Sequence, residues 1–136
     1  MKLVVDANAF FAALLKDGVS RKLFFYPDFS LYSPEFIVRE FVKNRAELAS
    51  KYDPRAGNFT EFADTMLKHV RLVADFELMP FMPAATTLCE DEKDLLYLAC
   101  ALYCDAAVWS NDKHLKNQSR VRILTTSELA GELGLL

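Results

Sequence analysis

The sequence predicts an α/β fold, a three-layer α/β/α sandwich with a central parallel sheet of about five strands. Short apolar β-type runs alternate with helical segments, the pattern of helices packed on both faces of a parallel sheet. Two of these runs lead to carboxylates: the run from Lys2 to Val5 stops at Asp6, and the run from Ala106 to Trp109 leads to Asp112. Parallel sheets bind ligands outside the carboxyl ends of their strands. We therefore expect Asp6 and Asp112 to lie near each other.

Length and composition are those of one globular unit. The chain has 136 residues, 52% hydrophobic and 26% charged, so we expect residues 1–136 to form a single domain. No apolar run approaches the roughly 18 residues of a membrane span, and the chain opens on a charged strand start rather than a signal peptide. We expect a soluble, cytoplasmic protein with no membrane partner. The net charge of -3 disfavours broad electrostatic binding of nucleic acid, so a polyanion requires local basic patches or bridging cations.

The three cysteines do not predict a metal or redox site. Their number is odd, and Cys89, Cys100 and Cys104 lack the CxxC spacing of zinc and redox motifs. Cys100 and Cys104 lie one helical turn apart in an apolar segment, which favours buried free thiols and a reducing compartment.

After the opening strand, the chain is predicted to form two short helices and a strand. Residues 8–15 are apolar nearly all round and predict a buried helix that ends near Gly18. Ser20 is placed to cap a second helix, which ends before Pro27. Residues 29–32 alternate in polarity and predict a strand.

A long helix is predicted from Pro34 to about Ser50. Ser33 suits the N-cap and Pro34 suits the first helical position, where its missing N–H costs nothing. Glu40 lies off the apolar stripe and is free to face a cleft or solvent. The stripe consists of Ile37, Val38, Phe41, Val42, Leu48 and Ala49.

The middle of the chain is predicted to leave the sheet and return. Asn58 or Thr60 caps a helix that reaches roughly Val73, and together with the preceding helix it suits a cap or a dimer surface. Residues 76–79 predict a short strand, and residues 84–89 predict a helix of one or two turns.

The last third combines the most apolar helix with the last two strands. Residues 91–103 have an acidic start and an apolar body, which predicts a buried helix. A strand over 106–109 leads into a turn and a short helix, and residues 121–124 predict the final strand. Thr125, with Glu128 three residues later, predicts a capping box that opens the last helix.

The carboxylates are the candidate functional residues. Asp91 and Asp94 lie one turn apart at a predicted helix start and share a face. Asp6, Asp91 and Asp112 also suit N-cap or turn positions, so a purely structural role is an alternative for each. If the sheet forms as predicted, Asp6, Asp94 and Asp112 converge with Glu40 on one crevice.

Carboxylates that converge must be protonated, dispersed or bound to cations, because like charges repel. Oxygen ligands from Asp and Glu suit Mg²⁺ or Mn²⁺, and no set of Cys and His suggests zinc. Periodicity leaves Glu35 and Glu47 open as alternatives to Glu40.

The order and spacing of four segments resemble the PIN-domain family, which includes the VapC toxins of prokaryotic toxin–antitoxin pairs. The segments are Asp6-Ala7-Asn8, Ser33-Pro34 followed by Glu40, Asp91 with Asp94, and Trp109-Ser110-Asn111-Asp112-Lys113-His114-Leu115. The resemblance covers essentially the whole chain. It implies a Mg²⁺- or Mn²⁺-dependent ribonuclease whose catalytic and metal-binding acids are Asp6, Glu40, Asp94 and Asp112. The supporting positions are Asn8, Asp91, Ser110 and Asn111.

The resemblance also implies an RNA substrate, an antitoxin protein as partner and a homodimer. Hydrolysis is expected to proceed by in-line attack of a metal-activated water on the phosphodiester. His114 stands where many family members carry a second acid, which leaves the number of metal ions open. Candidates to hold flanking phosphates are Arg39, Lys43, Lys113 and Lys116.

Two other functions are alternatives. Phosphatases of the haloacid-dehalogenase type also begin with a strand-end aspartate, but they need a second acid two residues later, where this chain has Asn8. A catalytically inactive PIN domain that binds RNA or another protein would keep the fold without the reaction, and the four intact acids argue against it.

Overall fold

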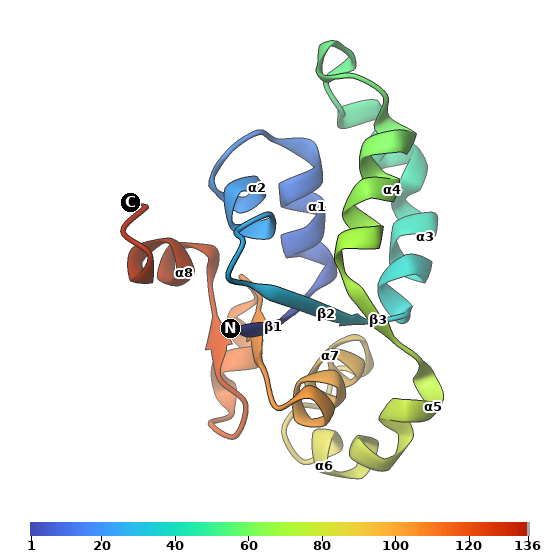
Figure 1. The fold of residues 1–136 in the computed structure, drawn as a ribbon. Helices are drawn as coiled ribbons and strands as arrows, with labels where there is room; N and C mark the ends of the chain where they lie inside the picture. The colour runs from blue at the N-terminus through green and yellow to red at the C-terminus, as the bar shows by residue number, and fades with distance from the viewer. Residues whose placement is uncertain (136) are drawn as a thin grey trace.

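A parallel sheet of five strands forms the centre of the computed structural model, which describes residues 1–135 (Figure 1). The strand order is β3-β2-β1-β4-β5, and every neighbouring pair is parallel. This arrangement confirms the predicted fold class. The strands are β1 (Lys2–Val5), β2 (Ser30–Pro34), β3 (Arg71–Val73), β4 (Ala107–Trp109) and β5 (Ile123–Leu124).

Helices cover both faces of the sheet, because its central strands are apolar on both sides. In β1, Leu3 and Val5 pack into one core and Val4 packs into the other. The first face carries α1 (Ala7–Leu15), α2 (Val19–Phe24), α3 (Phe36–Lys51), α4 (Phe59–His69) and α8 (Thr126–Glu132). The second carries α5 (Asp75–Leu78), α6 (Met82–Thr86) and α7 (Glu92–Cys104).

Three short 3-10 helices connect these elements: η1 (Pro54–Ala56), η2 (Met79–Phe81) and η3 (Lys113–Asn117). None of the helices within residues 1–135 has the length and apolar character needed to cross a lipid bilayer. Cys100 and Cys104 are buried in α7, as predicted, and they and the partly buried Cys89 are free thiols.

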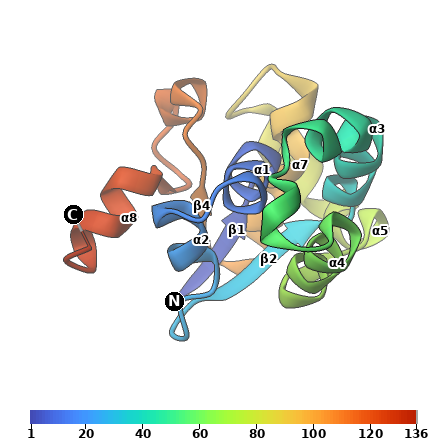
Figure 2. The ribbon, with the colours of Figure 1, turned by 90° about the horizontal axis from the view of Figure 1, so that it is seen from above.

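Helices α3 and α4 run side by side and extend beyond the sheet (Figures 1 and 2). Aromatic contacts join them: the rings of Phe41 and Phe59 stack with centroids 6.1 Å apart, and Tyr52 meets Phe59 edge-on at 5.4 Å. The predicted stripe of α3 is correct for Phe41 but wrong for Val42, which is 64% exposed.

The predicted start of the long helix is wrong, because Ser33 and Pro34 end strand β2 instead of opening α3. The Ser33 hydroxyl is buried and donates to the Val5 carbonyl at 3.0 Å, so it joins β2 to β1 rather than capping a helix. Ser20 also does not cap α2, whose N-cap is Gly18.

The other errors concern the segment between α4 and α6. The helix expected to reach Val73 ends at His69, and Arg71–Val73 form the edge strand β3 by pairing with β2. The strand predicted over residues 76–79 is instead α5 and the start of η2. Pairing with β2 is a long-range interaction, so local periodicity gave no sign of it.

Candidate functional site

Asp6 lies where β1 ends and α1 begins. Its backbone N–H donates to the Trp109 carbonyl at 3.2 Å, which joins the end of β1 to β4, and its Oδ1 accepts from the Ala9 N–H at 2.8 Å. The N-cap role considered for Asp6 is therefore real, but it leaves Oδ2 for other contacts. Burial raises the pKa of Asp6, and repulsion by Asp112 adds to the rise, while the hydroxyl of Ser110 and the Ala9 N–H oppose it.

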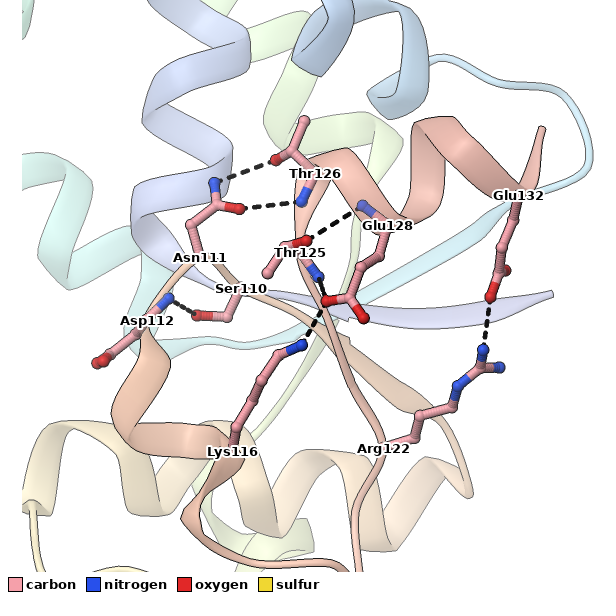
Figure 3. Close-up of polar contacts among 9 residues, drawn as sticks. All are labelled: Ser110, Asn111, Asp112, Lys116, Arg122, Thr125, Thr126, Glu128 and Glu132. Carbon is pink, nitrogen blue, oxygen red and sulfur yellow. Dashed lines mark hydrogen bonds and ion pairs between the residues drawn. The ribbon is translucent and has the colours of Figure 1, made fainter. Parts of the chain in front are cut away.

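Asp112 lies three residues after the end of β4. Its N–H donates to the buried Ser110 hydroxyl oxygen at 3.0 Å (Figure 3), and its Oδ1 accepts from the His114 N–H at 2.9 Å to cap η3. The Ser110 hydroxyl therefore holds the backbone of Asp112 and lies near the Asp6 carboxylate, whose pKa it lowers.

Asn111 points away from these acids. Its Nδ2 donates to Thr126 Oγ1 at 3.1 Å and its Oδ1 accepts from the Thr126 N–H at 2.9 Å (Figure 3). Thr126 Oγ1 also accepts from the Trp109 indole N–H at 3.0 Å. Asn111 thus holds the end of β4 against the start of α8.

Two more acids come from the first turn of α7. Asp91 caps this helix, since its Oδ1 accepts from the Lys93 N–H at 3.0 Å. Asp94 lies one turn further on and is half-buried. Burial, followed by repulsion from Asp112, Asp91 and Asp6, raises the pKa of Asp94 to about 6.

One cavity of about 490 Å³ brings all of these acids together with Glu40. The walls come from the end of β1, the start of α1, the middle of α3, the first turns of α7 and the end of β4. The polar residues expected at the site that line it are Asp6, Asn8, Glu40, Asp91, Asp94 and Asp112. Residues far apart in sequence therefore meet at the carboxyl edge of the sheet.

The two rivals of Glu40 both have other partners. Glu35 precedes α3, and its Oε1 accepts from the Asp75 N–H at 3.2 Å. Glu47 lines the cavity but pairs with Lys51 at 2.9 Å. Of the three glutamates, Glu40 therefore best fits the site that the resemblance implies. Its chemical function stays a prediction.

The donor set suits a hard divalent cation, because every candidate ligand is an oxygen. Asp91 and Asp112 each use Oδ1 for a backbone N–H, so Oδ2 of each is left for another ligand, while the Asp6 carboxylate also meets the Ser110 hydroxyl. As the side chains are oriented, however, no three Asp, Glu, His or Cys residues within 1–135 stand close enough to hold a metal ion. A metal ion bound by three or more of these acids would therefore require the carboxylates to turn inward.

Basic residues flank the acids. Lys43 on α3, one of the candidates to hold a phosphate, lines the cavity, and Lys93 on α7, which was not among those candidates, lines it as well. Two other predicted phosphate-binding residues form ion pairs: Arg39 with Asp75 at 3.1 Å, and Lys116 with Glu128 (Figure 3).

Tyr97 is a second residue of the cavity that the sequence analysis missed. Its signal was present, because residues three apart on a helix share a face and Tyr97 follows Asp94 by three. It is 5% exposed, and burial, with the charges of Asp6 and Glu40, raises the pKa of its hydroxyl. Phe11 also lines the cavity and gives it an apolar wall.

Both the sequence and the fold resemble known proteins. A family model described as PIN domain matches residues 4–133. A chain in the crystal structure of VapBC2 from Rickettsia felis bound to a DNA fragment from their promoter has a TM-score of 0.70 and 13% identity, and the match covers 92% of this chain and 98% of that chain. No match was found among curated proteins. The family match spans nearly the whole chain, whereas the structural similarity concerns the fold alone.

Proposed function

Because the chain belongs to the PIN-domain family, a family of nucleases, we propose that it is an endoribonuclease that uses Mg²⁺ or Mn²⁺ to hydrolyse RNA phosphodiester bonds. The observation that carries this proposal is the single cavity into which Asp6, Glu40, Asp91, Asp94 and Asp112 are gathered. Glu40 in the middle of α3 and Asp94 within α7 are not cap residues, so capping alone does not account for the gathering.

The electrostatics of the cavity support a cation. The pKa of Asp94 is raised in part by three neighbouring acids, which is the repulsion expected of carboxylates gathered without counter-charge. A divalent ion relieves this repulsion and also reduces the repulsion between an acidic protein and a polyanionic substrate. Oxygen ligands favour Mg²⁺ or Mn²⁺ over zinc.

We assign the ion to Asp6, Glu40, Asp94 and Asp112. When bound, such an ion neutralises charge on the phosphate and lowers the pKa of a bound water. The residues of the chain supply the rest of the binding site. Lys43 is placed to hold a phosphate beside the one that is cut, and the apolar ring of Phe11 offers a surface for an unpaired base. A site of this kind favours single-stranded RNA.

Cleavage of an unstructured RNA oligonucleotide tests the proposal. The wild-type protein with Mn²⁺ should produce internal cuts, and EDTA or Asp112→Asn should abolish them. Asn caps a helix as well as Asp does, so this variant keeps the cap of η3 and removes only the charge. The matched control is Asp64→Asn, which makes the same change at an exposed position of α4 outside the cavity. Equal cutting by Asp112→Asn and the wild type would contradict the proposal.

We also propose that the chain is the toxin of a toxin–antitoxin pair in the cytoplasm. The likeness of its fold to a chain of VapBC2 supports this proposal. A small DNA-binding protein encoded by an adjacent gene is the expected antitoxin, and adding it should suppress RNA cleavage.

A homodimer is proposed as well, and Val42 on α3, at 64% exposure, adds apolar surface for a second copy. Light scattering measures the oligomeric state of the protein directly.

A further inference from the structure

The hydroxyl of Tyr97 is buried and its O–H has no acceptor in residues 1–135, although the Ala7 N–H lies near its oxygen. Its ring is fixed edge-on against Phe36, with centroids 6.2 Å apart, so the hydroxyl has little freedom to reach solvent. A buried hydroxyl without a partner lowers the stability of the fold, since its hydrogen bonds to water are lost and not replaced. Such a group is an unusual feature of a folded protein and calls for a physical reason.

Tyr97 is part of the wall of the acidic cavity. Tyr97 lines the cavity one turn deeper on α7 than Asp94, and the charges of Asp6 and Glu40 act on it directly. A phenol is protonated at neutral pH, so Tyr97 presents an O–H donor to a group of acceptors.

Of the four acids assigned to the ion, Glu40 is the one whose carboxylate accepts no hydrogen bond within residues 1–135, since Asp94 accepts from the Cys89 thiol at 3.9 Å. Asp6 is held by the Ala9 N–H and faces Ser110, and Asp112 is held by the His114 N–H. In Glu40, the backbone carbonyl accepts from Asn44 at 2.8 Å, but no hydrogen bond fixes its carboxylate within the described chain. The unpaired donor and the unfixed acceptor therefore belong to the same cavity.

We propose that Tyr97 is a positioning residue whose hydroxyl donates to the Glu40 carboxylate when that carboxylate turns inward to hold a divalent cation. The inference rests on the proposed function, because it assigns Glu40 to the ion. A hydrogen bond from outside the ligand shell orients a carboxylate and strengthens metal binding. One contact thus satisfies the buried hydroxyl and fixes the acid that α3 contributes.

Tyr97→Phe removes only the hydroxyl and tests the inference in two measurements that need no RNA. In EDTA, the variant should melt a few degrees, about 2–5 °C, above the wild type, because its unpaired group is gone. Calorimetric titration should show Mn²⁺ binding about tenfold weaker than in the wild type. In a Glu40→Gln background, adding Tyr97→Phe should cause no further loss of Mn²⁺ affinity, since the acceptor is already altered.

Tyr103→Phe is the matched control. It removes a hydroxyl from the same helix, where Tyr103 donates to Glu77 at 3.1 Å and is 42% exposed. This control should neither raise the melting temperature nor change Mn²⁺ affinity.

The outcomes separate this inference from the proposed function. Three results would overturn the role of Tyr97 and leave the ribonuclease in place. These are unchanged Mn²⁺ affinity in Tyr97→Phe, a lower melting temperature of this variant in EDTA, or a full further loss of Mn²⁺ affinity when Tyr97→Phe is added to Glu40→Gln. A wild type that binds Mn²⁺ with the expected Tyr97–Glu40 coupling but cuts no RNA would overturn the ribonuclease and support the role of Tyr97. A wild type that binds no Mn²⁺ would overturn both.

Discussion

Replacing Asp94 with Asn should stabilise the metal-free protein at neutral pH. The pKa of Asp94 is raised from 3.8 to about 6 in the fold, so its ionised form is disfavoured there. Below pH 3.8 the carboxyl is protonated in both the folded and the unfolded state, so it does not lower the free energy of unfolding. Between pH 4 and 6 it ionises first in the unfolded chain, and above pH 6 the whole cost is present. The contribution of Asp94 to stability therefore falls as pH rises through this range. An Asn at this position does not ionise, so the variant lacks this pH dependence.

The size of the effect follows from the same shift. A change of roughly two pKa units corresponds to about 3 kcal/mol for a group shielded from water. One side of Asp94 faces solvent, so screening reduces the cost to about 1 kcal/mol. The variant should then melt about 3–5 °C above the wild type at pH 7.5 and within a degree or so of it near pH 4.

Thermal and urea unfolding in EDTA at pH 4, 6 and 7.5 measure this difference, with Asp64→Asn as the control that should show no such trend. A gap between Asp94→Asn and the wild type that stays constant with pH would refute the reasoning. Mn²⁺ at a hundred times its dissociation constant should then stabilise the wild type by about 2.7 kcal/mol and the variant by much less. Equal stabilisation of both would show that Asp94 does not hold the ion.

Three further results are expected. Thr126→Val should lower stability by about 1–3 kcal/mol in urea unfolding, because it leaves the Trp109 indole N–H, now bonded at 3.0 Å, without an acceptor. Asn58→Ala should cost about 1 kcal/mol through loss of the α4 cap, with RNA cleavage unchanged. Lys43→Ala should weaken RNA binding equally for all RNA sequences and reduce the slope of log affinity against log salt by about 0.7. Fluorescence anisotropy measures both effects, and the control Lys22→Ala on α2 should show neither.

The elements that could be predicted are those whose signals are local. The capping box of Thr125 and Glu128 is present in the structure, and α1 and α7 follow from runs of apolar residues. Ser33 and Pro34 misled because the same pair that opens a helix also suits the end of a strand, and the deciding contact, from Ser33 to Val5, crosses to another strand. Strand β3 was missed for the same reason.

The candidate site was predictable to the extent that it follows from topology. Parallel strands end at one edge, so Asp6 and Asp112 could be expected together, and both line the cavity. Tyr97 was missed because an aromatic residue in an apolar helix is typical of the core, which outweighed its place on the same helix face as Asp94; its unpaired hydroxyl is visible only in the structure. Asn111, expected to support the site, binds Thr126 instead, a contact with α8 that no local pattern indicates.

Capping and the gathering of acids are two consequences of the same connection. In a parallel α/β fold the carboxyl end of a strand leads into the amino end of a helix, so a cap residue such as Asp6 necessarily lies at the ligand-binding edge. The amino ends of α1 and α7 also border the cavity, and their dipoles help to stabilise the negative charge gathered there.

Two substitutions at Asp6 separate these roles. Asp6→Asn keeps an acceptor for the Ala9 N–H and removes the charge, so it should retain or raise stability in EDTA while losing Mn²⁺ binding and RNA cleavage. Asp6→Ala removes the cap as well and should unfold more easily than Asp6→Asn by about 1 kcal/mol. Calorimetry and urea unfolding of the two proteins test both statements. If Asp6→Asn bound Mn²⁺ as the wild type does, Asp6 would be a cap and nothing more.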